Sequence, residues 1–258
     1  MAIRPHILIV EDEDAIARGL KFNFELEGYD AIVLGDGPQT LAYFDSPQKP
    51  IDLVVLDLML PGMSGYEILR SIRERDPRVP IMVLSARTLS EDRAHAFDCG
   101  TDQYMTKPFA LPELLSRVRN LLDRRRRFAT GDDESTTLPD ECAVGLAKIN
   151  FRTFEVTHGD EVHTLTTMEL QLLRYFLEHE GQVLSRQQIL KDVWEQNADV
   201  TTRTIDNFVM RLRKYLEADP TVPQHLLSVR GTGYRFVVAR TGECSQSGSD
   251  VELPDAGE

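Results

Sequence analysis

Residues 53–65 read LVVLDLMLPGMSG, and this stretch decides the fold of the first half of the chain. Leu53–Leu56 is a short apolar run that is rich in β-branched residues, and Asp57 follows it directly. Such runs, apolar without strict alternation, are typical of parallel strands that are buried on both faces. Further runs of this kind occur at His6–Val10, Ala31–Leu34 and Ile81–Leu84, with a shorter one at Gln103–Met105.

Amphipathic segments separate these runs. One carries Ile16, Leu20 and Phe24 at helical spacing, and another has apolar residues on one face from 114 to 122. Five strands that alternate with five helices predict an α/β domain over residues 5–124, with a doubly wound five-stranded parallel sheet. In such a sheet the functional site lies at the carboxyl ends of the strands.

The second half of the chain predicts a different architecture. Residues 128–141 are small, polar and acidic, so we expect a linker over residues 125–141. Three short alternating runs then predict a small antiparallel sheet. These runs are Ala143–Ile149, Thr153–Thr157 and Glu161–Leu165.

Capping boxes and helical spacing predict three helices after this sheet. Thr166-x-x-Glu169 and Ser185-x-x-Gln188 open the first two. The third has an apolar face made by Ile205, Phe208, Val209, Leu212 and Leu216. A hairpin around Gly231-Thr232-Gly233 completes a winged helix-turn-helix α+β domain over residues 142–240. We expect the acidic tail, residues 241–258, to be disordered.

The composition excludes several classes of protein. The 258 residues include 42 acidic and 29 basic side chains, and a hydrophobic content of 41% excludes disorder of the whole chain. No apolar stretch approaches the roughly 18 residues that span a bilayer, so we expect no membrane association. Three cysteines without CxxC spacing indicate a reducing, cytoplasmic environment. Residues 201–240 carry seven basic and three acidic side chains, which favours a local polyanion site.

Polar side chains follow four of the predicted strands. Glu11 and Asp12 follow the first, Asp57 the third and Ser85 the fourth, and Lys107 follows the fifth. Three carboxylates in one pocket repel one another, and Mg²⁺ would relieve that repulsion. Together with Lys107 it could neutralise a phosphoryl group on Asp57, because a carboxylate nucleophile can form an acyl phosphate.

A purely structural interpretation of these residues also exists. Asp12 or Asp14 could cap the helix that follows, and a Lys-Pro pair is often only a turn. The coincidence of all these residues at strand ends favours the functional interpretation.

The chain resembles a known family in both halves. The segments ILIVEDE, LVVLDLMLPGMSG, VLSAR and GTDQYMTKPF resemble the flavodoxin-like receiver domain of bacterial two-component response regulators. LTTMELQLLRYFLEHEGQVLSRQQIL, TRTIDNFVMRLRKYLE and SVRGTGYRF resemble the winged-helix output domain of the OmpR/PhoB subfamily. The resemblance implies a DNA-binding transcriptional regulator, not an enzyme, that a partner histidine kinase activates by phosphorylation.

The resemblance also implies roles for the strand-end residues. Asp57 would be the phosphoacceptor, and Ser85 and Tyr104 would form a switch pair. Lys107 would hold a phosphoryl oxygen, with a cis peptide bond before Pro108. The Mg²⁺ ligands would be Asp12 directly, Glu11 through water, Asp57, and the Met59 backbone carbonyl.

A homodimer of phosphorylated chains is a further implication. In the family's cross-subunit ion pairs, Arg93 would pair with Glu113 and Asp98 with Arg119. A third pair usually places Asp opposite the residue that is Arg117 here, but this chain has Gln103 at that position. We therefore expect a weak dimer.

The third helix of the second domain predicts contacts with double-stranded DNA. Arg203, Asn207, Arg211 and Lys214 recur on one face, and a hairpin with Arg230 follows. Such a stripe can be a solvated face, but a recognition helix fits the major groove, where Asn and Arg read bases. By resemblance, Thr204, Arg213 and Tyr234 would contact phosphates, and Trp194 is equally expected to be a phosphate contact or a core residue. Phe208 replaces a frequent His, and RNA polymerase is a further candidate partner.

Two other classes of function compete with this interpretation. An aspartyl-phosphate phosphatase or phosphotransferase would need a general acid beside Asp57, and the sequence shows no positioned acid. An RNA-binding output domain would need a platform of stacking aromatic residues, which does not occur.

Overall fold

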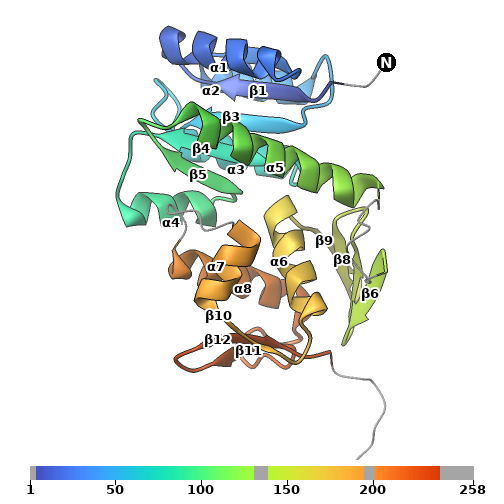
Figure 1. Cartoon of the computed structure of the whole chain (residues 1–258). Helices are drawn as coiled ribbons and strands as arrows, with labels where there is room; N and C mark the ends of the chain where they lie inside the picture. The colour runs from blue at the N-terminus through green and yellow to red at the C-terminus, as the bar shows by residue number, and fades with distance from the viewer. Residues whose placement is uncertain (1–3, 131–138, 195–200, 239–258) are drawn as a thin grey trace, which may run out of the picture.

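The computed structural model describes residues 4–130, 139–194 and 201–238. The first domain, residues 4–130, has a parallel sheet between layers of helices, and the second domain, residues 139–238, has three helices and two small sheets (Figure 1). Within these ranges, no helix combines the length and the apolar character that crossing a membrane requires.

The first domain contains the predicted five-stranded parallel sheet, in the order β2-β1-β3-β4-β5. The direction of chain winding reverses at β1, so β1 and β3 are neighbours at the point where doubly wound sheets form their sites. The strands are β1 His6–Val10, β2 Asp30–Leu34, β3 Leu53–Asp57, β4 Ile81–Ser85 and β5 Gln103–Thr106.

Alternate residues of the strands belong to two different apolar cores. Ile7 and Ile9 of β1 cluster with Phe24 and Val118, which lie on the first and fifth helices. Leu8 belongs to the opposite core, which contains residues of the third helix. Both faces are therefore covered, as unbroken apolar strands require. The helices are α1 Asp14–Leu26, α2 Gly37–Asp45, α3 Gly65–Arg75, α4 Ser90–Asp98 and α5 Leu111–Thr130.

The second domain contains the three predicted helices, α6 Thr167–Glu178, α7 Arg186–Trp194 and α8 Thr202–Leu216. The terminal hairpin consists of β11 Leu226–Val229 and β12 Gly233–Phe236, and β10 Val183–Ser185 pairs with β12. The other sheet has four antiparallel strands: β6 Glu141–Val144, β7 Ala147–Asn150, β8 Glu155–His158 and β9 Glu161–Thr164. The single predicted run Ala143–Ile149 forms two strands, because Gly145 adopts a φ of +57° and reverses the chain.

Helix α5 is longer than the sequence predicts. It continues to Thr130, six residues beyond the predicted end of the first domain. The Arg125 guanidinium donates to the Ile51 carbonyl (2.7 Å), and the Phe128 ring packs edge-to-face on Phe154 of the second domain. These tertiary contacts stabilise helix where composition indicates a linker. Of the predicted linker, 131–138 lie outside the described residues, as do the predicted tail from 241 and residues 195–200.

The two domains share a continuous apolar core in this structure. Phe97 of α4 meets Phe208 of α8 edge-to-face, with 6.3 Å between ring centroids. Figure 1 shows α4 and α8 next to each other at the junction of the two domains. The third helix of the second domain therefore lies against the first domain.

Candidate functional site

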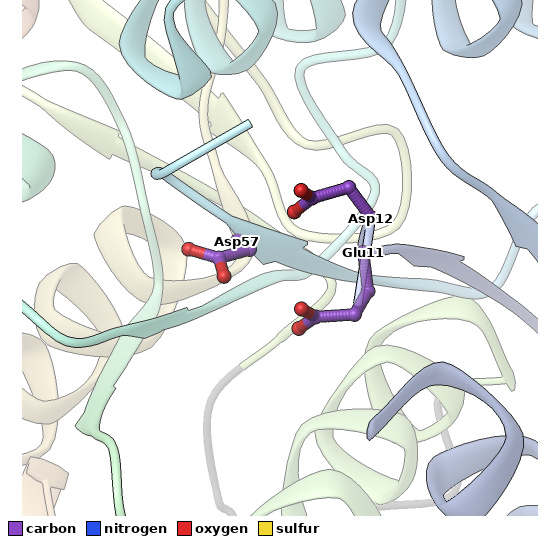
Figure 2. Close-up of side chains that lie close together, drawn as sticks. All are labelled: Glu11, Asp12 and Asp57. Carbon is purple, nitrogen blue, oxygen red and sulfur yellow. The ribbon is translucent and has the colours of Figure 1, made fainter. Parts of the chain in front are cut away.

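The candidate site lies at the carboxyl edge of the parallel sheet. β1 ends at Val10, so Glu11 and Asp12 extend just beyond it, and Asp57 is the last residue of the neighbouring β3. One carboxylate oxygen from each of Glu11, Asp12 and Asp57 lies within 4.8 Å of the others. Figure 2 shows the three side chains together at this edge. The sheet thus brings together the acidic residues that the sequence places at separate strand ends.

The three carboxylates differ in exposure to solvent. Glu11 and Asp57 are 3% and 5% exposed, whereas Asp12 is exposed. The N-cap residue of α1 is Glu13, and Asp14 is already inside the helix. The structure therefore does not show the alternative in which Asp12 or Asp14 caps this helix.

Lys107 joins two of the carboxylates. Its ammonium Nζ donates to Glu11 Oε2 (2.7 Å) and to Asp57 Oδ2 (2.5 Å). The predicted cis peptide bond between Lys107 and Pro108 is confirmed. Burial would lower the pKa of Lys107, but hydrogen bonds and charge from Asp57 and Glu11 outweigh it, so the pKa lies above its usual range. Lys107 therefore brings a fixed positive charge into the pocket.

Glu11 has the opposite balance of effects. Burial raises the pKa of the Glu11 carboxyl above its usual range, and the hydrogen bond and charge of Lys107 only partly offset this rise. The negative charge of Glu11 is thus disfavoured mainly by its removal from water, and to a smaller extent by the nearby charge of Asp57.

The oxygen atoms at this edge suit a hard divalent cation. The cluster offers carboxylate oxygens only, and the exposure of Asp12 leaves access for water, which matches the preference of Mg²⁺. The main chain at Met59 lies beside the cluster, since its N–H donates to Asp57 Oδ1 (2.8 Å). These residues fit the predicted magnesium site.

The predicted switch residues lie on the two strands beyond β3: Ser85 is the last residue of β4, and Tyr104 lies on β5. Ser85 and Tyr104 are both fully buried. Ser85 Oγ accepts from the Arg87 N–H (3.2 Å), and the Tyr104 hydroxyl donates to the Arg87 carbonyl (2.8 Å). Both side chains thus bind the backbone of Arg87, and the Tyr104 ring is buried inside the receiver.

Arg87 is a residue of this site that sequence reasoning missed. It ends the VLSAR segment, so its position was visible, but its backbone contacts with Ser85 and Tyr104 were not. Its guanidinium also pairs with Asp92 of α4 (2.8 Å). Arg87 therefore connects the switch residues to the helix that contacts the second domain.

The predicted dimer residues have partners within the chain. Arg117 pairs with Glu113, and its guanidinium lies 3.4 Å from Gln103 Oε1. Arg119 pairs with Glu27, the C-cap residue of α1 (2.8 Å). Arg93 and Asp98 lie on α4, and Asp98 accepts a hydrogen bond from the second domain. Each of these residues except Glu27 lies on α4, β5 or α5.

The polar stripe of α8 is divided between solvent and the first domain. Arg203 and Lys214 are exposed, as is Arg230 on the turn between β11 and β12. Asn207 and Arg211 are half-buried. Asn207 Nδ2 donates to Asp98 Oδ1 (2.5 Å), and the Arg211 guanidinium donates to the Phe97 carbonyl (3.0 Å).

The three predicted phosphate contacts make hydrogen bonds inside the second domain. Thr204 is buried, and its hydroxyl lies 3.4 Å from the Thr201 N–H. Arg213 Nη2 donates to the Leu226 carbonyl (2.6 Å), and the Tyr234 hydroxyl donates to Asp206 Oδ1 (2.6 Å).

Phe208 and Trp194 pack together in the core. Both are about 1% exposed, and their rings meet edge-to-face with centroids 5.2 Å apart. Trp194 is thus a core residue in this structure, and Phe208 turns inward rather than toward a ligand.

Comparison with known proteins covers both domains. The model of the response regulator receiver domain matches residues 7–119, and that of the C-terminal domain of transcriptional regulatory proteins matches residues 159–236. The chain belongs to the response-regulator family. It is a transcriptional response regulator of the OmpR/PhoB type, with a receiver domain and a DNA-binding domain.

Relatives of this response regulator match it over most of their length. The sensory transduction protein RegX3 of Mycobacterium tuberculosis is 39% identical over 230 residues, covering 89% of this chain and 98% of that protein. The transcriptional regulatory protein KdpE of the same species is 36% identical, with the same coverage. A solved RitR mutant has a TM-score of 0.70 at 23% identity over 90% of this chain and 98% of its own, which shows a shared fold.

Proposed function

We propose that Asp57 of this response regulator accepts a phosphoryl group from a partner sensor histidine kinase. The observation that carries the proposal is the position of Lys107, whose ammonium bridges Asp57 and Glu11 at the carboxyl edge of the sheet. An ammonium beside a carboxylate that can act as nucleophile offsets the charge of an incoming phosphoryl group.

The residues of this chain that take part in the transfer all lie at this edge. A carboxylate oxygen of Asp57 attacks phosphorus, the bond from phosphorus to the kinase histidine nitrogen breaks, and that nitrogen keeps the electron pair. The product is an acyl phosphate on Asp57, in which Lys107 pairs with a phosphoryl oxygen and the Ser85 hydroxyl donates to another. Bound Mg²⁺ would supply positive charge toward the phosphoryl oxygens. Its ligands would be Asp12, Asp57, the Met59 carbonyl, and Glu11 through water.

The phosphorylated receiver then forms a homodimer in this proposal. Cross-subunit pairs join Arg93 to Glu113 and Asp98 to Arg119. The paired DNA-binding domains occupy adjacent half-sites about 10–11 base pairs apart in double-stranded DNA, one helical turn, as helix-turn-helix pairs do. RNA polymerase is the further partner at a promoter, and the proposed setting is the cytoplasm.

Phosphorylation is tested by incubating the protein with acetyl phosphate and Mg²⁺ and measuring its intact mass. The wild type gains one phosphoryl group, and chelation of Mg²⁺ abolishes the gain. Asp57→Asn gains none, whereas Asp45→Asn, which alters a surface carboxylate on α2, behaves as the wild type. Labelling of Asp57→Asn at wild-type stoichiometry would show that the phosphoacceptor is another residue.

The choice of nucleic acid is tested by mobility shift. The phosphorylated protein retards duplex DNA selected from a random library, and single-stranded RNA does not compete. Preferential competition by RNA would favour the RNA-binding alternative instead.

A further inference from the structure

Residues 241–258 are an acidic segment that the proposed function leaves without a role. This segment follows the DNA-binding domain, whose last described residue is Val238. It contains no lysine or arginine and five carboxylate side chains: Glu243, Asp250, Glu252, Asp255 and Glu258. Guanidinium and ammonium groups bind carboxylates as well as phosphates. The acidic segment can therefore occupy the same basic side chains as DNA.

Three exposed basic side chains of the DNA-binding domain form what we call the basic surface. Arg203 and Lys214 lie on α8, and Arg230 lies in the turn between β11 and β12. None of the three has an ionic partner among the residues that the structure describes. Arg213 on the same helix differs, because its guanidinium binds the Leu226 carbonyl. The basic surface thus presents three positive charges that no described acid compensates.

Hydrogen bonds hold α8 against the hairpin. Asp206 Oδ1 on α8 accepts from the Tyr234 hydroxyl on β12 (2.6 Å), and Arg213 Nη2 donates to Ser228 Oγ on β11 (2.9 Å). The three bases of the basic surface therefore lie on neighbouring elements, and one anionic chain can contact more than one of them.

The acidic segment is long enough to reach this surface. Twenty residues follow Val238 in the sequence, and an extended chain covers up to about 3.3–3.6 Å per residue, or about 70 Å in all. The four residues of β12 separate the end of the domain from the hairpin turn by about 14 Å. The fifteen residues of α8 span about 22 Å. Both elements of the basic surface are therefore within its reach.

The distribution of charge favours this surface over the receiver. Residues 1–120 carry 19 acidic and 13 basic side chains and so repel the segment, whereas residues 201–240 carry three acidic and seven basic side chains. Exposed ion pairs are individually weak. A covalent tether offsets this weakness, because it keeps the acids at a high effective concentration near the bases.

We propose that residues 241–258 dock on the basic surface and compete there with the phosphates of DNA. The inference rests on the proposed function, because it takes from it the DNA-binding role of α8 and the hairpin. Docked carboxylates must leave before phosphates can bind, so the affinity for DNA is reduced by the fraction of molecules in which the surface is free. Salt screens the docking, so this reduction is largest at low salt.

Docking is tested without DNA by carbodiimide cross-linking of the unphosphorylated full-length protein. The reagent joins a carboxylate to a lysine amine that it contacts, and mass spectrometry of peptides identifies the pairs. At about 50 mM salt, Lys214 should be joined to the acidic segment at least about threefold more than Lys148, an exposed lysine on β7. This preference should disappear at about 500 mM salt, because the screening length falls to a few ångströms.

Two variants show whether the bases hold the segment. Arg203→Ala combined with Arg230→Ala should lower the yield of the Lys214 cross-link by about half or more, since two of the three charges are lost. Arg18→Ala, which removes an exposed arginine from α1 of the receiver, should leave the yield unchanged.

Competition is tested with a duplex DNA of scrambled sequence, because phosphate contacts do not depend on sequence. A chain that ends at residue 240 should bind it about 3- to 10-fold more tightly at about 50 mM salt and less than about 2-fold more tightly at about 300 mM. Asp160→Asn combined with Glu161→Gln removes two exposed acids from the same domain and should give no such gain. A full-length variant with a neutral segment should match the shortened chain: Glu243→Gln, Asp250→Asn, Glu252→Gln, Asp255→Asn and Glu258→Gln.

The outcomes separate this proposal from the proposed function. Equal cross-linking of Lys214 and Lys148 overturns the docking, even if the shortened chain binds DNA more tightly, because such a gain reflects only general repulsion between the segment and DNA. Preferential cross-linking of Lys214 without any gain in affinity supports the docking. It shows instead that DNA does not bind the basic surface, which contradicts the proposed role of α8 and the hairpin.

Discussion

Lys107 is the residue that makes the acidic edge of the receiver a coherent site. Its ammonium pairs with two buried carboxylates, Glu11 just after β1 and Asp57 at the end of β3. Its positive charge is therefore compensated by two negative neighbours. The same ammonium lies at the start of the segment between β5 and α5. A phosphoryl group on Asp57 that attracts Lys107 can therefore move the backbone of the proposed dimer face.

Lys107→Ala should accept the phosphoryl group but fail to dimerise. The nucleophile is intact, whereas the charged hydrogen bond that couples Asp57 to the backbone is lost, which should weaken the phosphorylated dimer roughly tenfold or more. Intact mass reports the label and sedimentation velocity reports the dimer. Lys49→Ala, which removes an exposed lysine paired with Asp30, serves as the control. Wild-type dimerisation of labelled Lys107→Ala would contradict the coupling.

Tyr234 carries a pH dependence of its own. Burial, together with the hydrogen bond to Asp206, raises the pKa of Tyr234 to about 12. The pKa in the unfolded chain is lower, so the stability contributed by the protonated phenol is fully present below about pH 10 and is lost as the pH rises through about 12. Unfolding thus becomes easier over this window.

Tyr234→Phe has no phenolic proton to lose, so its free energy of unfolding should fall less with pH. Between about pH 9 and about pH 12, the decrease should be about 2 kcal/mol smaller than in the wild type. Urea unfolding followed by circular dichroism at the two pH values measures it. Identical decreases in both proteins would mean that Tyr234 ionises as an ordinary tyrosine.

Among the elements, α8 has two faces with clearly different surroundings. Its apolar residues lie in the core of the second domain, with Ile205 and Leu212 fully buried, whereas its polar stripe meets both solvent and the end of α4. The residues of the stripe therefore have two different environments in this structure. Lys214 is exposed, and Asn207 is held by the receiver.

Asn207→Ala and Lys214→Ala should have distinct effects on DNA binding by the phosphorylated protein. Asn207→Ala should relax preference at one base position, at a cost of about 1–3 kcal/mol on the selected site and little on scrambled DNA. Lys214→Ala should weaken both DNAs alike and reduce the slope of log affinity against log salt by about 0.9. Salt titrations on both DNAs measure these effects. An equal loss from Asn207→Ala on both DNAs would show that Asn207 does not read a base.

At the scale of the whole molecule, the charge of the DNA-binding domain predicts that affinity for DNA depends more on dimerisation than on one domain alone. Residues 142–240 hold 12 basic and 12 acidic side chains, so a single DNA-binding domain has little general attraction to DNA. The proposed dimer on two half-sites would double the contacts with phosphates. We expect Gln103 to weaken this dimer, because its amide carries no charge and lies opposite Arg117.

Gln103→Asp should tighten the phosphorylated dimer. A carboxylate opposite Arg117 adds an ion pair worth about 0.2–1 kcal/mol, so dimer affinity should rise about 2- to 5-fold. Sedimentation equilibrium with acetyl phosphate and Mg²⁺ gives the dissociation constant. Gln48→Asp, at an exposed position outside α4, β5 and α5, controls for added charge. No change in Gln103→Asp would mean that Gln103 and Arg117 do not contribute to the dimer.

The sequence by itself determined the strands of the receiver, their parallel arrangement and the acidic edge. Buried parallel strands need uninterrupted apolar runs, and Asp57 stands directly after such a run. Since the carboxyl ends of β1 and β3 meet in a doubly wound sheet, the proximity of Glu11 to Asp57 followed from position alone. The three helices of the second domain followed from capping boxes and apolar spacing for the same local reason.

Only the tertiary structure decided where α5 ends and what covers α8. Local composition favours a linker after residue 124. The helix nevertheless extends to Thr130, because the Phe128 ring packs on Phe154 of the other domain. Periodicity shows that Asn207 lies on a polar face, but its partner Asp98 is 109 positions away in the chain. Contacts between surfaces depend on how separately folded layers pack, and local periodicity carries no information about that packing.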